Sequence, residues 1–471
     1  MSFLTIAAAP IQLTEISYLF WQRQPKHGLS LLIYQNYLLI IMVVSSYILH
    51  NYLNENEVLL YSTMTSALIV LEKPIYDKIF VSSDFSDTEI INELHKMGFL
   101  VDSHEYELNV LDNIYKNEVD YRMPVIKIFS TNKCNAKCYY CFEEGISQID
   151  MTQDVAEQTT RFIIENYPKK HIQINWFGGE PLLNFDIIEM ITLRLIEAGF
   201  VLKTHVTTNG SLITQKKINF FKKYYETVSI QVTIDEIGEQ YGRIKRYIDI
   251  SKEDAFAKVV NNVHLLLKSG GISTRIRINF LKKNINQGMS VFDYLKEEFK
   301  YDSQIVIYLA PLTFDENKPY DVVTEHTHLK LMQFYNSRGV VFDDKDKEKS
   351  ILSSLSLKPK AIPCGACRTK NLTITADGHI YKCHRIAKYE KFCIGNVWSG
   401  INNDNPCMDF FNNRSTESNS EECRLCKVYP ICRGGCKVVI DILHQKHKTC
   451  DIYTNHGELI KMLYEVLNNK N

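Results

Sequence analysis

Apolar and polar positions follow two different periods along the chain, and these periods predict its main elements. From Val125 onward, short apolar runs rich in β-branched residues alternate with runs whose apolar residues recur at helical spacing. Repeated strand–helix units with apolar strands predict an α/β fold with a parallel sheet covered by helices, open or barrel-shaped. Strands are expected at Val125–Ser130, Ile172–Phe177, Val201–Thr207, Val228–Ile234, Thr274–Phe280 and Ile305–Ala310, and helices near 155–165, 184–199, Thr214–Tyr225 and Ala255–Lys268.

The segment before this region has a different pattern. Tyr47–Leu53 and Val58–Thr63 alternate around a polar turn and predict a β-hairpin. Helical stretches are expected at Pro74–Phe80 and Asp87–Met97, the second ending near Gly98. This small unit resembles the winged-helix recognition element of peptide-modifying enzymes, which adds a leader peptide as an extra strand. A plain packing extension is the alternative.

Residues 1–41 need a separate interpretation. The run Leu29–Leu49 contains no charged residue over 21 positions, which is long enough to cross a bilayer. Its serines, Gln35, Asn36 and tyrosines weaken the membrane interpretation, and no basic segment or cleavage site of a secretory signal precedes it. We expect residues 1–41 to be an extension outside the fold, with Met42 as the true start, rather than a membrane anchor.

Composition narrows the class of protein. The 471 residues suit two or three domains, and 45% hydrophobic residues exclude a wholly disordered chain. The net charge of −1 gives no reason to expect nucleic acid as a partner. The 13 cysteines are an odd number and lie unevenly, none before Cys134 and ten from Cys364 to Cys450. This clustering indicates metal ligation rather than a disulfide framework.

Three cysteines follow the first predicted strand directly. Cys134, Cys138 and Cys141 lie within eight residues, in the spacing C-x3-C-x2-C. Three thiolates can hold three irons of a [4Fe–4S] cluster and leave the fourth iron open for a substrate or cofactor. A zinc site completed by a distant histidine, or three ordinary core cysteines, would be the alternatives.

Further polar motifs stand at the ends of the next strands, where parallel folds place their chemistry. Phe177-Gly178-Gly179-Glu180-Pro181 offers glycines that let backbone approach a ligand and a carboxylate for an amino group. Thr207-Thr208-Asn209-Gly210 follows the third strand, and Thr233-Ile234-Asp235 ends the fourth.

Together, the C-x3-C-x2-C loop, Gly-Gly-Glu-Pro and Thr-Asn-Gly resemble the radical S-adenosylmethionine (SAM) superfamily over roughly residues 123–312. The resemblance implies a partial (β/α)6, TIM-like barrel, a cluster whose unique iron binds SAM, and reductive cleavage of SAM to a 5′-deoxyadenosyl radical. It implies Cys134, Cys138 and Cys141 as cluster ligands. As contacts of SAM it implies Tyr140, Gly178, Gly179, Glu180 and Asn209, with Thr233, Asp235, Arg246, Arg277 and Asn279 as further polar lining.

The C-terminal cysteines form two dense groups. Their order, C-x10-G-x4-C, then C-x2-C-x5-C-x3-C, then C, resembles the SPASM extension of radical SAM enzymes, which holds two auxiliary [4Fe–4S] clusters. Zinc ribbons would also use such cysteines. Cys393 and Cys407 match nothing and are expected as buried or free thiols. By analogy, Cys364, Cys367, Cys383 and Cys436 bind one cluster, and Cys423, Cys426, Cys432 and Cys450 bind the other.

The resemblance also bears on the substrate. SPASM proteins mostly modify peptides, and sulfatase maturases carry an Asp where this chain has His384. The expected general base of a sulfatase maturase is therefore missing, although the imidazole of His384, the candidate catalytic residue, can also deprotonate. A hydrogen-bond donor near a cluster sulfur is the alternative role of His384. We therefore expect maturation of a ribosomal peptide through a thioether or carbon–carbon cross-link. Anaerobic sulfatase maturation, oxidising Cys or Ser to formylglycine, is the alternative, and a non-enzymatic zinc-binding module is a further one.

The expected organisation is an extension (1–41), a recognition-element-like unit (42–122), a radical SAM core (123–342) and a SPASM domain (343–471). Expected partners are a precursor peptide with a leader and a reductant such as flavodoxin or ferredoxin. Thiolate ligands favour a reducing cytoplasm.

Overall fold

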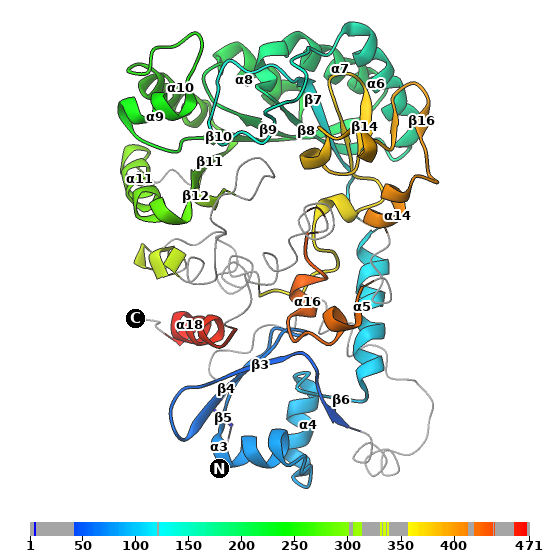
Figure 1. Cartoon of the computed structure of the whole chain (residues 1–471), viewed down its shortest axis with the longest axis vertical. Coiled ribbons are helices and arrows are strands. Elements are labelled where there is room, and N and C mark those ends of the chain that lie inside the picture. Colours follow the sequence, from blue (N-terminus) through cyan, green and yellow to red (C-terminus); the bar gives the residue numbers. More distant parts are fainter. Residues whose placement is uncertain are drawn as a thin grey trace. The chain divides into compact units, whose positions relative to one another are not determined.

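The computed structural model describes residues 4–5, 42–119, 122–300, 305–312, 330–331, 333–335, 337–338, 357–412, 419–436, 438 and 456–468. The chain forms two compact units (Figure 1). Unit 1 comprises Met1–Tyr121, Thr324–Cys364 and Asn413–Asn471, and unit 2 comprises Arg122–Val323 and Gly365–Asn412. The cysteine-rich region expected as one SPASM domain is therefore divided between both units.

Unit 2 contains a sheet of ten described strands in the order β12-β11-β10-β9-β8-β7-β13-β14-β15-β16. Neighbouring strands from β12 to β13 are parallel, and β13 to β16 pair antiparallel. The strands are β7 (Val125–Thr131), β8 (His171–Gly178), β9 (Val201–Thr208), β10 (Thr227–Thr233), β11 (Ser273–Phe280), β12 (Ile305–Pro311), β13 (Leu372–Ile374), β14 (His379–Tyr381), β15 (Gly395–Asn396) and β16 (Gly400–Ile401).

Helices connect the six consecutive parallel strands β7 to β12, as Figure 1 shows for unit 2. This succession confirms the predicted α/β class and every predicted strand of the core. The helices are α6 (Gln153–Asn166), α7 (Phe185–Glu197), α8 (Gln215–Tyr224), α9 (Gly238–Lys245), α10 (Ala255–Ser269), α11 (Ile285–Glu298) and α14 (Pro406–Asn412).

Local signals in the sequence fix the ends of these helices. The Thr152 hydroxyl accepts a hydrogen bond from the Val155 N–H at the start of α6. Helix α7 ends at Glu197 and is followed by Gly199, whose φ of +84° is the left-handed conformation that glycine adopts readily. Asn184 precedes α7 without capping it, because its amide donates to the carbonyls of Ser130 and Met151 instead.

Side chains of the parallel strands alternate between two environments. Along β8, β9, β10 and β11, fully buried residues such as Ile174 and Ile276 alternate with partly buried ones. The buried set is mostly apolar, with threonines at three positions, and faces the helices. The partly buried set is mostly polar and occupies the opposite face of the sheet, called here the inner face.

Unit 1 contains a four-stranded antiparallel sheet in the order β1-β5-β4-β3 and a separate β2–β6 pair. The predicted hairpin is confirmed as β3 and β4, and Asp87 caps the second predicted helix, α4, by accepting from the Ile90 N–H. The elements are β1 (Leu4–Thr5), β2 (Val43–Val44), β3 (Ile48–Tyr52), β4 (Glu57–Ser62), β5 (Leu68–Glu72), β6 (Leu100–Val101), α3 (Lys73–Tyr76), α4 (Thr88–Lys96), α5 (His104–Val119), α15 (Glu421–Arg424), α16 (Tyr429–Cys432) and α18 (His456–Asn468).

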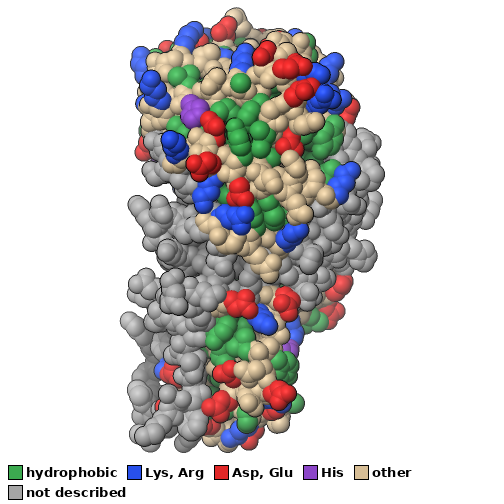
Figure 2. Space-filling model, turned by 90° about the vertical axis from the view of Figure 1, so that its left-hand side faces the viewer, with side chains coloured by type: hydrophobic (Ala, Val, Ile, Leu, Met, Phe, Trp, Pro, Cys, Tyr) green, Lys and Arg blue, Asp and Glu red, His purple; other side chains and the backbone are tan. Residues whose placement is uncertain are grey.

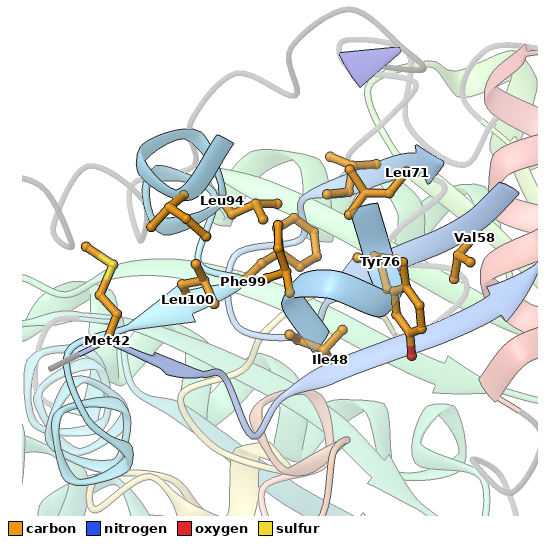
Figure 3. Close-up of a cluster of buried hydrophobic side chains, with 12 residues drawn as sticks. Met42, Ile48, Val58, Leu71, Tyr76, Leu94, Phe99 and Leu100 are labelled. Atoms are coloured by element: carbon orange, nitrogen blue, oxygen red, sulfur yellow. The ribbon is translucent and has the colours of Figure 1, made fainter. Parts of the chain in front are cut away.

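The unit 1 sheet has an apolar cluster on each face. On one face, Leu49, Leu59 and Tyr61 pack with Ile460 and Leu463 of α18. On the other face, α3 and α4 cover a second cluster, drawn in Figure 3. Its buried members are Met42, Ile48, Val58, Leu60, Ile69, Leu71, Tyr76, Ile79, Ile91, Leu94, Phe99 and Leu100.

Shortening Leu94 is expected to destabilise unit 1. Its side chain is fully buried in the cluster of Figure 3, so Leu94→Ala leaves a cavity and lowers the free energy of unfolding by about 2–5 kcal/mol. Val81→Ala is the matched control, since Val81 is 68% exposed and its shortening should cost less than about 0.5 kcal/mol. Urea unfolding measures both, and equal shifts would contradict the described core.

The N-terminal region bears on the expectation that residues 1–41 lie outside the fold. Leu4 and Thr5 pair with Leu71 and Val70 of β5, so these two residues add a short strand to the unit 1 sheet. Residues 6–41, with most of the charge-free run from Leu29, lie outside the described residues. Among the described residues, no helix combines the length and apolar character needed to span a bilayer.

On the face that Figure 2 shows, acidic and basic side chains are interspersed.

Candidate functional site

The sequence motifs meet at one edge of the unit 2 sheet. The loops after β7, β8, β9 and β10 carry the cysteine triplet, Gly-Gly-Glu-Pro, Thr-Asn-Gly and Asp235, in that order. These four strands are parallel neighbours, so their carboxyl ends lie at the same edge. The predicted site therefore consists of segments that the fold brings together.

The cysteine loop is ordered by backbone contacts with α9. The Lys137 N–H donates to the Lys245 carbonyl over 2.9 Å, and the Ile248 N–H donates to the Asn135 carbonyl over 2.9 Å. A tight turn joins two of the cysteines, because the Cys141 N–H donates to the Cys138 carbonyl over 3.1 Å. Cys134, Cys138 and Cys141 are partly buried thiols.

The glycines of Gly-Gly-Glu-Pro serve the packing of this loop. A Cβ on Gly178 would lie 2.1 Å from the Thr131 carbonyl oxygen, and one on Gly179 would lie 2.2 Å from that of Lys133. Gly178 also has a φ of +115°. The pair thus lets the end of β8 approach the backbone that leads into the cysteine loop, a role that the motif alone did not indicate.

Replacing Gly179 is expected to displace the cysteine loop. The Cβ of Gly179→Ala would overlap the Lys133 backbone, so the loop must move and the reconstituted protein should lose about one [4Fe–4S] cluster per chain. Gly145→Ala is the control, because the Cβ would meet nothing within 4 Å there, although Gly145 is left-handed, with a φ of +89°, and Gly179 is not. Iron and sulfide analysis measures the difference, and unchanged iron in Gly179→Ala would contradict this role.

Glu180 links the second motif to the third. Its carboxylate is fully buried and accepts hydrogen bonds from the Asn209 N–H (2.7 Å), the Thr208 hydroxyl (2.7 Å) and the Leu182 N–H (3.1 Å). Burial raises the pKa of Glu180, and these donors oppose the rise. The carboxylate therefore orders both turns.

Asn209 extends the same network to the cysteine loop. Its amide donates to the Asn135 side-chain oxygen over 2.8 Å, and its own side-chain oxygen accepts from the Ser211 hydroxyl over 2.7 Å. Asn135 in turn donates to Ser211 over 3.1 Å. The first and third motifs are thus joined directly.

A buried ion pair lies beside the cysteine loop. Lys245 Nζ and Asp235 Oδ2 are 2.7 Å apart, with side chains only 2% and 3% exposed. Tyr140 completes the cluster, since its hydroxyl donates to Asp235 and accepts from Lys245 over 2.7 Å. Burial would lower the pKa of Lys245, but the charge of Asp235 and the nearby Cys138 reverse this and leave the pKa raised.

The position of Lys245 differs from the sequence prediction, which selected its neighbour Arg246. Arg246 is exposed, because it follows α9 in a left-handed conformation with a φ of 51°. Lys245 lies four residues after buried Tyr241, on the same helical face, and reaches the site. The helical period of α9 was the signal that could have distinguished them.

The thiols of the cysteine loop suit a cationic metal cluster. Burial raises the pKa of the Cys134 thiol to about 12, and Glu180, Cys138 and Cys141 add to this rise. Burial also raises the pKa of Cys138, although Lys245 opposes it. Neighbouring thiolates with so little access to water need a compensating positive charge, which the iron ions of an iron–sulfur cluster provide.

His384 lies on the inner face of unit 2, against Lys127 of β7. Lys127 Nζ is 2.8 Å from His384 Nδ1 and 4.6 Å from the centre of the Phe177 ring. The Phe142 and Phe177 rings lie 5.7 Å and 5.0 Å from the imidazole. His384 and the first cysteine loop therefore border the same region of unit 2.

The contact with Lys127 fixes the hydrogen-bonding pattern of His384. Burial lowers the pKa of Lys127 to about 8, with Cys383 and Glu143 opposing, so the amine is mainly an ammonium at pH 7. An ammonium only donates, so Nδ1 accepts and Nε2 carries the proton of a neutral ring. Burial, Lys127, Arg385 and Arg277 together hold the pKa of His384 well below its usual range. The ring thus presents an N–H donor, whereas the sequence analysis expected a proton acceptor.

Two further predicted residues also lie on the inner face. Thr233 ends β10 directly opposite Arg277 of β11. Arg277 Nε donates to the Asn279 side-chain oxygen over 2.8 Å. The Asn279 N–H donates to Asp235 over 2.8 Å, so this face continues into the buried ion pair.

The C-terminal cysteines are distributed between the two units. Cys367 and Cys383 belong to unit 2, where Cys383 follows the β13–β14 hairpin, and Cys364 and Cys436 belong to unit 1 with Cys423, Cys426 and Cys432. Cys367 is buried and the others are partly buried or exposed. Cys450 lies outside the described residues. Both auxiliary ligand sets therefore stay predictions.

The site and fold agree with comparisons to known proteins. The radical SAM superfamily model matches residues 128–295, all within unit 2. A relative, the radical SAM cyclopropyl synthase TigE of Paramaledivibacter caminithermalis, is 22% identical over 80% of this chain and 84% of its own length.

Two solved structures share the fold. Native anSMEcpe with bound AdoMet and Cp18Cys peptide has a TM-score of 0.56 and 18% identity over 74% of this chain and 99% of its own. Streptococcus suis SuiB bound to precursor peptide SuiA has a TM-score of 0.50 and 16% identity over 85% of this chain and 96% of its own.

These findings identify a radical SAM domain in unit 2. Through this domain the chain is a radical SAM enzyme, and the cofactors of the domain are SAM and a [4Fe–4S] cluster. Its sequence is similar to the cyclopropyl synthase TigE and to a cysteine-type anaerobic sulfatase-maturating enzyme of Clostridium novyi, which is 22% identical over 66% of this chain and 87% of its own length.

Proposed function

We propose that this enzyme modifies a ribosomally made peptide, forming a thioether or a carbon–carbon cross-link. The observation that carries the proposal is the single network that joins the cysteine loop to Glu180, Asn209 and the Asp235–Lys245 pair. The similarity to SuiB with its precursor peptide supports the peptide substrate. When bound, the cluster and SAM supply the reductive bond cleavage that starts radical chemistry.

The residues of the chain have separate tasks in this proposal. Cys134, Cys138 and Cys141 hold the cluster on an ordered loop. The Gly178–Glu180 turn and Asn209 shape the adjoining SAM site, and Tyr140, held by Asp235 and Lys245, offers its ring to the adenine. Thr233 is a further polar contact for SAM at the end of β10.

His384 is proposed to donate a hydrogen bond to the peptide. Lys127 holds Nδ1, Phe142 and Phe177 pack against the ring, and Nε2–H has no hydrogen-bond acceptor among the described residues. A neutral ring with Nδ1 occupied is a poor proton acceptor. This favours cross-linking over formylglycine formation, for which sulfatase maturases carry an Asp as general base at this position.

Removing the donor at position 384 is expected to separate SAM cleavage from product formation. His384→Ala should lower the yield of modified peptide about 100-fold, while 5′-deoxyadenosine formation stays within about threefold. His384→Gln keeps an N–H donor and should recover part of the yield, which a proton acceptor role would not allow. His379→Ala is the control, because His379 is a half-exposed histidine of β14 paired with Asp377 of the preceding turn.

Unit 1 is proposed to recognise the leader of the precursor peptide. Its β3–β4 hairpin with α3 and α4 has the strand and helix order expected of such a unit. Deleting residues 42–119 should then weaken peptide binding but leave SAM cleavage by unit 2 detectable.

A flavodoxin or ferredoxin is the proposed reductant, and the many thiolate ligands favour the cytoplasm as the compartment.

The activity is tested on anaerobically reconstituted protein. We expect about twelve irons per chain, conversion of SAM with dithionite to 5′-deoxyadenosine, and a peptide lighter by two hydrogen atoms per cross-link. A short open reading frame beside the gene, encoding a leader and a repetitive core, would supply the peptide probe. Zinc without iron and sulfide would favour the binding-module alternative. Uncoupled SAM cleavage with unchanged peptide would contradict the proposed substrate class.

A further inference from the structure

A pair of arginines on the inner face of unit 2 has no acidic partner among the described residues. Arg275 and Arg277 are two residues apart on β11, so both side chains leave the sheet on the same side. Their neighbours on β10 and β12 are Gln231, Thr233, Val306 and Tyr308. None of these can neutralise a guanidinium.

The polar contacts of the two guanidiniums leave most of their donors free. Arg277 uses Nε for the Asn279 side-chain oxygen, so its two terminal nitrogens keep their hydrogens available. Arg275 lies over the Tyr308 ring, with its guanidinium carbon 5.4 Å from the ring centre. Neither arginine forms an ion pair with a carboxylate in the part of the chain that the structure describes, which includes all of β7 to β12.

The surroundings add to the positive charge rather than cancel it. Lys127 borders the same face, and Cys383 and then Glu143 are the groups that oppose the decrease of its pKa by burial. The carboxylate of Asp235 already forms an ion pair with Lys245 and accepts hydrogen bonds from the Tyr140 hydroxyl and the Asn279 N–H. Partly buried like charges without counter-ions are unfavourable, so this face is most stable with an anion bound.

His205 shows that these cations act on one another. It lies on β9 and its Nδ1 is 3.1 Å from the Ser229 hydroxyl oxygen. Burial lowers the pKa of His205 to about 4, and the charges of Arg275 and Lys127 add to this decrease. The inner face from β7 to β11 thus has a shared positive field.

We infer that Arg275 and Arg277 bind a carboxylate of the peptide substrate. The inference rests on the proposed peptide-modifying function and adds a specificity to it. Planar guanidiniums match a carboxylate with paired hydrogen bonds, and Tyr308 and Asn279 hold the two side chains in place. The carboxylate is an acidic side chain near the modified residue or the C-terminus of the peptide. Arg277, considered in the sequence analysis as a contact of SAM, is thereby assigned to the substrate.

Short peptides test this inference on the reconstituted enzyme with SAM present. The probes are acetyl-Gly-Gly-Glu-Gly-Gly-amide, its Gln counterpart as the amide, and the Gln counterpart with a free C-terminal carboxylate. Titration followed by NMR gives the dissociation constants. At least one acidic probe should bind about tenfold or more tightly than the neutral amide, and the one that does identifies the source of the carboxylate.

Variants locate the binding. Arg275→Gln and Arg277→Gln should each remove the preference for the acidic probe. Arg194→Gln should keep it, because Arg194 is half-exposed on α7 and bonds Glu157. Thermal unfolding of each variant establishes that it is folded. Equal affinity for all three probes, binding of none of them, or a preference that survives both variants would overturn the inference.

Two further measurements distinguish binding of the peptide carboxylate from binding of SAM. Equilibrium dialysis of SAM should give affinities within about threefold of the parent in both variants. A tenfold or greater loss of SAM affinity would place the arginines in the SAM site and overturn the inference. Absence of 5′-deoxyadenosine from the parent would contradict the proposed function instead, and that assay is independent of the charge preference.

Discussion

Cys138→Ala is expected to abolish the formation of 5′-deoxyadenosine, with a loss of at least about 1000-fold. The loop offers three thiols, and a cluster held by two has neither its geometry nor its stability. The same variant should lose about one third of the iron, since the auxiliary sets are independent of this loop. Anaerobic product analysis and iron determination measure the two effects together.

A cysteine outside the proposed ligand sets provides the control. Cys407 is partly buried in α14, and burial raises the pKa of its thiol, as for an ordinary packed cysteine. Cys407→Ala should keep both the iron content and the rate within about twofold. If Cys138→Ala retained full activity, the radical SAM mechanism would be wrong for this chain.

Lys245→Met is expected to destabilise unit 2 by about 3–5 kcal/mol even without a cluster. The substitution leaves the Asp235 carboxylate buried and without its cationic partner, because both side chains are almost fully inaccessible to water. It also removes the donor to the Tyr140 hydroxyl. Chemical unfolding of the apoprotein measures the loss.

Two variants serve as comparisons for Lys245→Met. One also removes the Asp235 carboxylate, and the other removes an exposed arginine of α9 and leaves Lys245 in place. Lys245→Met with Asp235→Leu should recover most of the lost stability, because no buried charge is then left alone. Arg243→Met on the exposed side of α9 should change stability by less than about 1 kcal/mol, since its bond to Glu239 is a surface pair. A single variant no less stable than the Arg243 control would contradict the buried pair.

The sequence predicted the core fold because each strand carries its own signal. Each strand is marked by its own β-branched run, and helix ends are marked by nearby residues such as Thr152, Thr214 and Gly199. The observed ends of the predicted core strands and helices therefore lie within about two residues of the expected ones. Long helix α5 was missed, because its apolar positions are interrupted by charged and amide residues.

The contacts within the site were harder to predict. A motif shows which residues stand at a strand end but not which neighbour each side chain meets. The burial of Lys245 depends on which face of α9 turns toward the site. The tautomer of His384 depends on Lys127, which is 257 positions away in the sequence. The packing role of Gly179 likewise depends on the Lys133 backbone.

The parallel pairing of β13 with β7 affects how the chain is made. The Val125 N–H reaches the Asn371 side-chain oxygen across 246 residues of sequence, and β13 adds to the edge of β7. During synthesis, β7 leaves the ribosome long before its partner, with hydrogen-bonding groups open to other chains. A nascent chain stopped before residue 371 should therefore be prone to aggregate and to attract chaperones, even though all six strands of the barrel are already present.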